Sequence, residues 1–424
     1  MLYVFDPYVL DTQLSSLCCR GRRLSLQPKT LDVLRLLIDR QGEVVSRKEL
    51  FESIWSDEVV SEGNLTQHIF MLRQAFTDAT PEQAIVVTVP GKGYRFARAV
   101  ARQPAAPVES TASEWRLYLR GRFFADRRNC ADLSRAISHF EQSLVIDQKN
   151  VAAHEGLAEA HALYAEYLFG APEIHFAEAR EHAERALSLD SASSDACAIL
   201  GDVAFFHDWD RDRASEYYAR AVAIAPDSKR ARISHAWFLS ATGRHATALA
   251  EASVALRSEP YCPKLLTALA ALKFYARRPA EAVAHCNDVL AMDPDDELVR
   301  FYLALSLMAL GEAREALRVS EEVLDKSYPQ HFLTTAATAA ARYGDSALAN
   351  RYRGRLLGVG NEGFVSSLNL GLIHVALGEP SQAIAALRQG VTQRDPWLVF
   401  LGEHPLFEPL HFRPDFNLVL QRVA

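Results

Sequence analysis

The side chains best suited to chemistry form one short polar series near the N-terminus of this 424-residue chain. Asn64, Thr66, Gln67, His68 and Met71 lie within two helical turns of one another. Amide side chains read adenine through paired hydrogen bonds in the major groove of DNA, and an imidazole can donate to guanine. We therefore predict that this series contacts base edges.

An apolar stripe predicts the helix that carries this polar series. The stripe consists of Leu65, Ile69, Leu72 and Phe76, at the helical period of 3.6 residues. We expect a helix from about Asn64 whose opposite side shows Asn64, Gln67, His68 and Met71. Arg73, two residues after Met71, would then lie nearer a phosphate.

Two helices and several short strands are expected to position this helix. The first helix follows Pro28, and the second begins at the capping box Ser46-Arg-Lys-Glu49. Their expected buried residues are Leu31, Leu34, Leu37, Ile38, Leu50, Phe51, Ile54 and Trp55. Strand-like runs are Tyr3–Phe5, Tyr8–Leu10, Ser16–Cys19 and Arg23–Leu26 before the helices, with a hairpin of Ile85–Val89 and Tyr94–Phe96 after them. The pattern predicts an α+β winged helix-turn-helix with a leading antiparallel sheet.

Three motifs of this region resemble the OmpR/PhoB-type DNA-binding domain: Asn64-Leu-Thr-Gln-His-Ile69, Leu72-Arg73 and Thr88-Val-Pro-Gly-Lys-Gly-Tyr-Arg-Phe96. The resemblance implies that the third helix enters the major groove and that the hairpin, or wing, contacts the backbone or minor groove. Many relatives have two arginines where this chain has Phe70 and Met71, so we expect fewer phosphate contacts here. The implied DNA-binding residues are Asn64, Thr66, Gln67, His68, Met71, Arg73, Thr88, Lys92 and Arg95.

The rest of the chain repeats with a period close to 34 residues. Alanine recurs at Ala136, Ala179, Ala214, Ala248, Ala282, Ala316, Ala349 and Ala383, and proline at Pro226, Pro260 and Pro294. Small residues let paired helices approach closely, the prolines stop the second helix, and Gly243, Gly311, Gly344 and Gly378 suit helix ends. The region resembles tetratricopeptide (TPR) repeats, which predicts an all-α solenoid.

A stretch rich in Pro, Ala and Ser separates the two patterns. We expect a winged-helix DNA-binding domain at 1–100, a linker at 101–113 and a TPR-like helical repeat domain at 114–424. The net charge is −7, yet the first hundred residues hold twelve basic and twelve acidic side chains, so charge alone does not identify a DNA-binding protein. Aromatic residues of the repeats, such as Trp237 and Tyr275, are interpreted as core, or in part as the lining of a binding groove.

Other sequence features argue against catalysis and cofactors. Gly358-Val-Gly-Asn-Glu-Gly363 matches a dinucleotide-binding pattern but lacks the preceding strand, and no nucleophile–base motif is present. His154, His161, His175 and His182 lack metal-site spacing and are interpreted as solvated or satisfied histidines. We expect that the protein is not an enzyme and that it has no cofactor and no metal site. Without a spanning segment or secretory signal, and without a CxxC pair among six cysteines, we expect a cytoplasmic protein.

These patterns predict a bacterial, sequence-specific DNA-binding transcriptional regulator. It resembles one-component regulators that join the two domains, so no receiver domain and no aspartate phosphorylation are expected. The expected partners are double-stranded promoter DNA, an unknown protein or small-molecule effector at the TPR-like domain, and a second copy on tandem sites. The resemblance also implies RNA polymerase contact through the loop at about Ser56–Gly63. The alternative is a TPR interaction scaffold whose winged helix docks protein rather than DNA.

Overall fold

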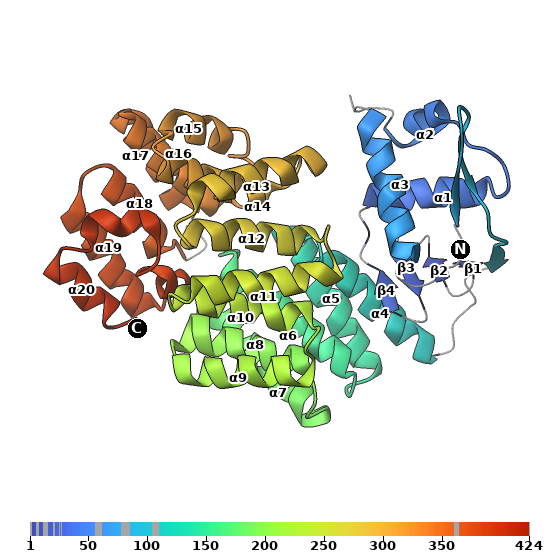
Figure 1. The fold of residues 1–424 in the computed structure, drawn as a ribbon. Helices are drawn as coiled ribbons and strands as arrows, with labels where there is room; N and C mark the ends of the chain where they lie inside the picture. The colour runs from blue at the N-terminus through green and yellow to red at the C-terminus, as the bar shows by residue number, and fades with distance from the viewer. Residues whose placement is uncertain are drawn as a thin grey trace. The chain divides into compact units, whose positions relative to one another are not determined.

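The computed structural model groups the chain into two compact units, residues 1–109 and 110–424 (Figure 1). It describes residues 2–5, 8–11, 16–19, 22–24, 26, 28–55, 62–77, 85–103, 110–359 and 364–423.

The first unit contains the antiparallel sheet, the three helices and the hairpin that the sequence predicts. Its elements are β1 (Leu2–Phe5), β2 (Tyr8–Asp11), β3 (Ser16–Cys19), β4 (Arg22–Leu24), α1 (Pro28–Asp39), α2 (Arg47–Ile54), α3 (Glu62–Thr77), β5 (Val86–Val89), β6 (Gly93–Phe96) and β7 (Ala101–Gln103). Five strands form one sheet in the order β4-β3-β2-β1-β7, and β5 pairs with β6. The predicted fold class of this unit is confirmed.

Strand β7 was not expected. Val4 in β1 pairs with Val9 on one side and with Ala101 on the other, so the chain adds an edge strand where a linker was predicted. Helix α4 then begins at Ser110, inside the other end of the predicted linker at 101–113. Composition suggested a linker because Pro and Ala are common there, but backbone pairing with β1 was not readable from one sequence.

One apolar core joins the sheet, the helices and the hairpin of this unit. The rings of Phe5 and Phe96 meet edge to face at 5.2 Å, and Tyr8 meets Phe76 of α3 at 4.9 Å. The predicted stripe of α3 is buried throughout, with its four residues at most 3% exposed. Ser46 caps α2, because the Glu49 N–H donates to its Oγ at 3.1 Å. The core therefore fixes α3 by one side.

Two residues of the predicted polar series lie inside this core. His68 and Met71 are each only 6% exposed. The His68 Nδ1 lies 2.8 Å from the Thr30 Oγ1, and its ring packs on Trp55 at 5.5 Å. The expectation that His68 and Met71 show on the open side of α3 is wrong. His68 follows Leu65 by three residues and precedes Leu72 by four, which places it on the buried side.

The second unit is built from antiparallel helix pairs, stacked one on the next (Figure 1). Its helices are α4 (Ser110–Ala125), α5 (Cys130–Ile146), α6 (Val151–Glu166), α7 (Pro172–Leu189), α8 (Ser194–Asp202), η1 (Val203–Asp208), α9 (Arg211–Ile224), α10 (Lys229–Ala241), α11 (His245–Ser258), α12 (Pro263–Tyr275), α13 (Pro279–Met292), α14 (Glu297–Ala309), α15 (Ala313–Glu321), α16 (Pro329–Tyr343), α17 (Ser346–Val359), α18 (Ser367–Ala376), α19 (Pro380–Gln393), η3 (Pro396–Phe400), η4 (Pro405–Leu410) and α20 (Pro414–Leu420). The predicted TPR-like solenoid is confirmed.

The repeated small residues lie where helices pack most tightly. All eight periodic alanines, from Ala136 to Ala383, are fully buried. The four turn glycines have positive φ angles, as in Gly344 at 101°, and each follows the end of a helix. The repeated alanines thus mark positions where helices approach closely, and the repeated glycines mark turn residues in the left-handed backbone conformation.

The end of the chain packs across the first helices of several pairs. Phe400 of η3 stacks on Tyr275 at 4.6 Å, and Trp397 donates from Nε1 to the Glu166 carbonyl at 2.7 Å. Near the start of α16, the Tyr328 hydroxyl donates to the Arg128 carbonyl at 2.7 Å. These contacts join repeats that are far apart in sequence, so the solenoid is braced across its stack.

Replacing Ala282 with Leu tests the packing of the helix pairs. Ala282 is fully buried in α13, so the larger side chain should lower the free energy of unfolding by about 1–3 kcal/mol through overpacking. Ala280→Leu, at an exposed position of the same helix, is the matched control. Denaturant unfolding with equal midpoints for both variants would contradict the packing assignment.

A pH titration tests the buried position of His68. Burial, aided by the charge of Lys29, lowers the pKa of His68 to about 4, so folding favours the neutral imidazole. The imidazole has a pKa of about 6.5 in the unfolded chain, so the contribution of His68 to the free energy of unfolding should be complete above that pH. This contribution should fall by about 3 kcal/mol as the pH drops toward 4. The difference in unfolding free energy between the natural chain and His68→Gln should shrink over this range. A difference independent of pH would refute this account.

Candidate nucleic-acid interface

The open side of α3 carries a different set of residues from the one predicted. Thr66 is exposed, Asn64 and Gln67 are half-buried, and Phe70 is 49% exposed. Thr66, Phe70 and Arg73 recur at helical spacing, opposite the buried stripe. Sequence reasoning named Phe70 only as a position where many relatives have arginine and did not assign it to this surface. Its spacing from Thr66 was the available signal.

Arg73 connects α3 to the hairpin. Its Nε donates to the Val86 carbonyl at 3.0 Å, and its Nη2 donates to the Thr88 Oγ1 at 2.6 Å. The sequence placed Arg73 near a phosphate and Thr88 on the wing, and the structure brings these two residues together. A planar guanidinium with two bonds to one strand fixes the wing relative to the helix.

The hairpin presents two cations to solvent. Lys92 is exposed in the turn between β5 and β6, and Arg95 is exposed in β6. Gly93 holds the hairpin against the segment before α2, since its φ is 145° and a Cβ there would lie 2.0 Å from the Val45 carbonyl oxygen. Val45 and Tyr94 exchange backbone hydrogen bonds at 2.8 and 3.0 Å at this point. The wing is therefore anchored at both edges.

The predicted DNA-binding residues thus divide into four groups. Thr66 and Gln67, with Asn64 beside them, lie toward the open side of α3, while Lys92 and Arg95 lie on the wing. Arg73 and Thr88 link the two elements, and His68 and Met71 belong to the core. Of the loop at Ser56–Gly63, residues 56–61 fall outside the described part of the chain.

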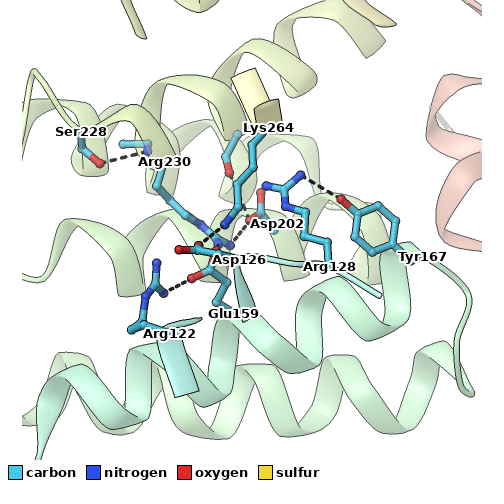
Figure 2. Close-up of polar contacts among 11 residues, drawn as sticks. Arg122, Asp126, Arg128, Glu159, Tyr167, Asp202, Ser228, Arg230 and Lys264 are labelled. Atoms are coloured by element: carbon cyan, nitrogen blue, oxygen red, sulfur yellow. Dashed lines mark hydrogen bonds and ion pairs between the residues drawn. The ribbon is translucent and has the colours of Figure 1, made fainter. Parts of the chain in front are cut away.

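A network of charged groups crosses the first helices of the solenoid (Figure 2). Glu159 in α6 contacts Arg122 of α4 and, at 2.8 Å, Arg230 of α10. Arg230 also lies 3.0 Å from Asp202 of α8, and Lys264 of α12 lies 2.6 Å from Asp126. Burial alone would raise the pKa of Glu159, but the two guanidinium groups outweigh it and hold that pKa well below its ordinary value.

This network ties the first helices together with charges. Glu159 and Asp202 are almost fully buried. Loss of the arginines that face them would leave a buried carboxylate without a counter-ion. Sequence reasoning did not find the network, because its members come from five different helices and share no motif. Figure 2 shows these side chains converging from neighbouring helices.

Metal-ligand clusters and membrane-crossing helices would mark other functional classes. No three His, Cys, Asp or Glu side chains there converge on one point as a metal site would require. Among the helices of those residues, none has both the length and the apolar character needed to cross a bilayer. Helix α17, rather than a strand, leads into the glycine pattern at 358–363, of which 360–363 are not described.

Comparison with known proteins identifies the first unit. Residues 21–96 match the family "Transcriptional regulatory protein, C terminal". The chain is 34% identical over 110 residues to the transcriptional regulator HilA of Salmonella typhimurium, covering 26% of this chain and 20% of HilA. It is 30% identical over 90 residues to the transcriptional activator CadC of Escherichia coli, covering 21% of this chain and 18% of CadC. The chain thus matches about a fifth of each relative's length.

Two solved structures resemble larger parts of the chain. A human IFIT1 dimer with m7Gppp-AAAA is 12% identical, with 86% of this chain and 88% of that chain covered and a TM-score of 0.51, which indicates a shared fold only. A tetratricopeptide repeat protein from Parabacteroides merdae is 14% identical, with 64% and 98% covered and a TM-score of 0.40. The family match places residues 21–96 in the family of C-terminal domains of transcriptional regulatory proteins. The chain carries this domain together with a TPR-like helical solenoid.

Proposed function

We propose that this protein is a sequence-specific DNA-binding transcriptional regulator that places α3 in the major groove of promoter DNA. The observation that carries the proposal is the open side of α3, held next to a cationic hairpin by Arg73. A helix fits the major groove, and a neighbouring wing is well placed to contact the backbone. The family match over residues 21–96 supports this assignment.

The burial of His68 changes which side chains we assign to base reading. Gln67, Asn64 and Thr66 carry the hydrogen-bonding groups of the open side, and an amide pairs well with adenine. His68 acts from within, by contacting Thr30 of α1 and the Trp55 ring that follows α2, and Met71 is buried as well. Phe70 offers an apolar ring, which matches the methyl group of thymine in the major groove.

We assign backbone contacts to the wing. Lys92 and Arg95 are exposed cations on a hairpin whose position is fixed. Contacts between such cations and phosphates add affinity that depends on salt and carry little sequence information. Residues 1–100 have no net charge, so we assign the salt-dependent part of the attraction to these two exposed cations.

We assign partner or effector binding to the solenoid, residues 110–424. Its first helices carry both an aromatic region and the charged network of Figure 2. Trp237, Tyr275 and Phe206 in the aromatic region already pack against η3, so η3 covers these rings from a partner. RNA polymerase and a second copy on tandem sites are the further partners that we propose for the DNA-bound form.

A TPR interaction scaffold is the second candidate. The equal numbers of basic and acidic residues in 1–100, together with the exposed ring of Phe70, would suit a winged helix that docks protein. The two proposals differ in one property, since only a DNA-binding domain gives affinity for duplex DNA that falls with salt.

Replacing Gln67 with Ala tests the base-reading assignment. Sites selected by the full chain from a random duplex library should bind the variant about 5- to 150-fold more weakly, the loss of one good base contact of about 1–3 kcal/mol. Gln382→Ala, at an exposed position of the solenoid, is the control. A variant that selects the same sites with undiminished affinity would exclude Gln67 from the interface.

Lys92→Ala and Arg95→Ala test the wing. Each lost phosphate contact should make the slope of log affinity against log salt shallower by about 0.9, while the preferred sequence stays the same. Lys149→Ala, which removes an exposed cation of the solenoid, should leave the slope unchanged. If the natural chain shows no salt-dependent binding to any duplex, the scaffold function is favoured.

A further inference from the structure

Four histidines line the contact between α6 and α7. His154 and His161 are two turns apart on α6, and His175 and His182 are two turns apart on α7. The antiparallel packing makes two pairs of them: the Nδ1 atoms of His154 and His182 are 3.0 Å apart, and so are those of His161 and His175. The rings of His161 and His182 lie 6.4 Å apart between the pairs. The two pairs therefore form one continuous row.

Hydrogen bonds and burial prepare this row for ligation. The Nε2 of His154 lies 3.2 Å from the Gln148 carbonyl, which fixes its proton on Nε2 and leaves a lone pair on Nδ1. Burial lowers the pKa of all four histidines, to about 4 for His161. A neutral imidazole is the form that binds a metal ion.

The local packing also makes room for the second pair. A Cβ at Gly170 would lie 2.4 Å from the Nε2 of His175, so a glycine is needed for that ring to occupy its place. The His175 ring also stacks on Tyr164 at 4.6 Å. The ring is thus held from two sides with its Nδ1 directed at His161.

The spacing of the nitrogens selects a class of ion. With metal–nitrogen bonds of about 2.05 Å, nitrogens 3.0 Å apart subtend an angle of about 94° at the metal. A tetrahedral ion such as Zn²⁺ needs an angle of about 109°, whereas square-planar or tetragonal ions take about 90°. Cu²⁺ and Ni²⁺ prefer that geometry, and Cu²⁺ has the higher affinity for nitrogen ligands.

We propose that each histidine pair chelates one divalent late transition-metal ion, Cu²⁺ foremost, with solvent completing the coordination. The ion would lie about 1.4 Å off the line between the two nitrogens, so both rings turn slightly when it binds. In each pair, the imidazole that carries its proton on Nδ1 shifts that proton to Nε2. No third ligand of the described residues converges on either pair, so the sites are bidentate.

The sequence alone did not indicate these sites. Neither helix has the HExxH spacing, and each pair takes one ligand from each helix. The proposal is independent of DNA binding, since the ions would be held within the solenoid. If the sites fail, the assignment of α3 and the wing stands unaffected.

Calorimetric titration of the full chain with Cu²⁺ tests the proposal, with electron paramagnetic resonance to count coordinating nitrogens. We expect two ions per chain beyond the background, each with two imidazole nitrogens, and weaker binding of Zn²⁺. His154→Gln and His161→Gln should each remove one ion, and His182→Gln and His175→Gln should do the same from the other helix. His139→Gln, which changes a half-buried histidine outside the row, is the matched control.

Two outcomes would overturn the proposal. One is a natural chain that binds no more Cu²⁺ than the double variant His154→Gln/His161→Gln, with both folded by circular dichroism. The other is a spectrum with a single imidazole nitrogen per ion, which indicates adventitious binding to separate histidines. Loss of one ion in the His139→Gln control would equally exclude the pairs as the sites.

Discussion

The burial of one side of α3 is the constraint on which the proposed DNA interface depends. A helix at the surface of a small unit buries only one side. The opposite side is the surface that a partner can contact. In this protein the apolar stripe, together with the Thr30–His68 hydrogen bond and the Trp55 ring, fixes that choice. Thr66, Gln67 and Phe70 then lie on the open side.

Polar groups of the first unit serve mainly to fix geometry. Arg73 binds the hairpin, His68 binds α1, and Ser46 caps α2. A unit without net charge can therefore still present an ordered surface, with the exposed cations Lys92 and Arg95 on its wing. Specificity in such an arrangement rests on shape and hydrogen bonding, with electrostatic attraction in a supporting role.

The solenoid follows a different physical principle. Each helix pair leaves an apolar side that only its neighbours can cover, so the repeats stabilise one another in series. Here the series is braced by charges across five helices and by the aromatic residues of η3. Contacts between distant repeats limit the opening of the stack, and a partner would therefore meet a preformed surface.

The sequence by itself determined the elements that depend on local patterns: the stripe of α3, the cap at Ser46, the hairpin around Gly93 and the 34-residue alanine period. Each of these reflects a periodicity or a backbone requirement contained within a few residues. Only the tertiary structure decided that His68 lies inside, that Arg73 binds the wing, that β7 replaces part of a linker and that histidines of α6 and α7 meet in pairs. These depend on contacts between segments distant in sequence, whose mutual distances no local pattern specifies.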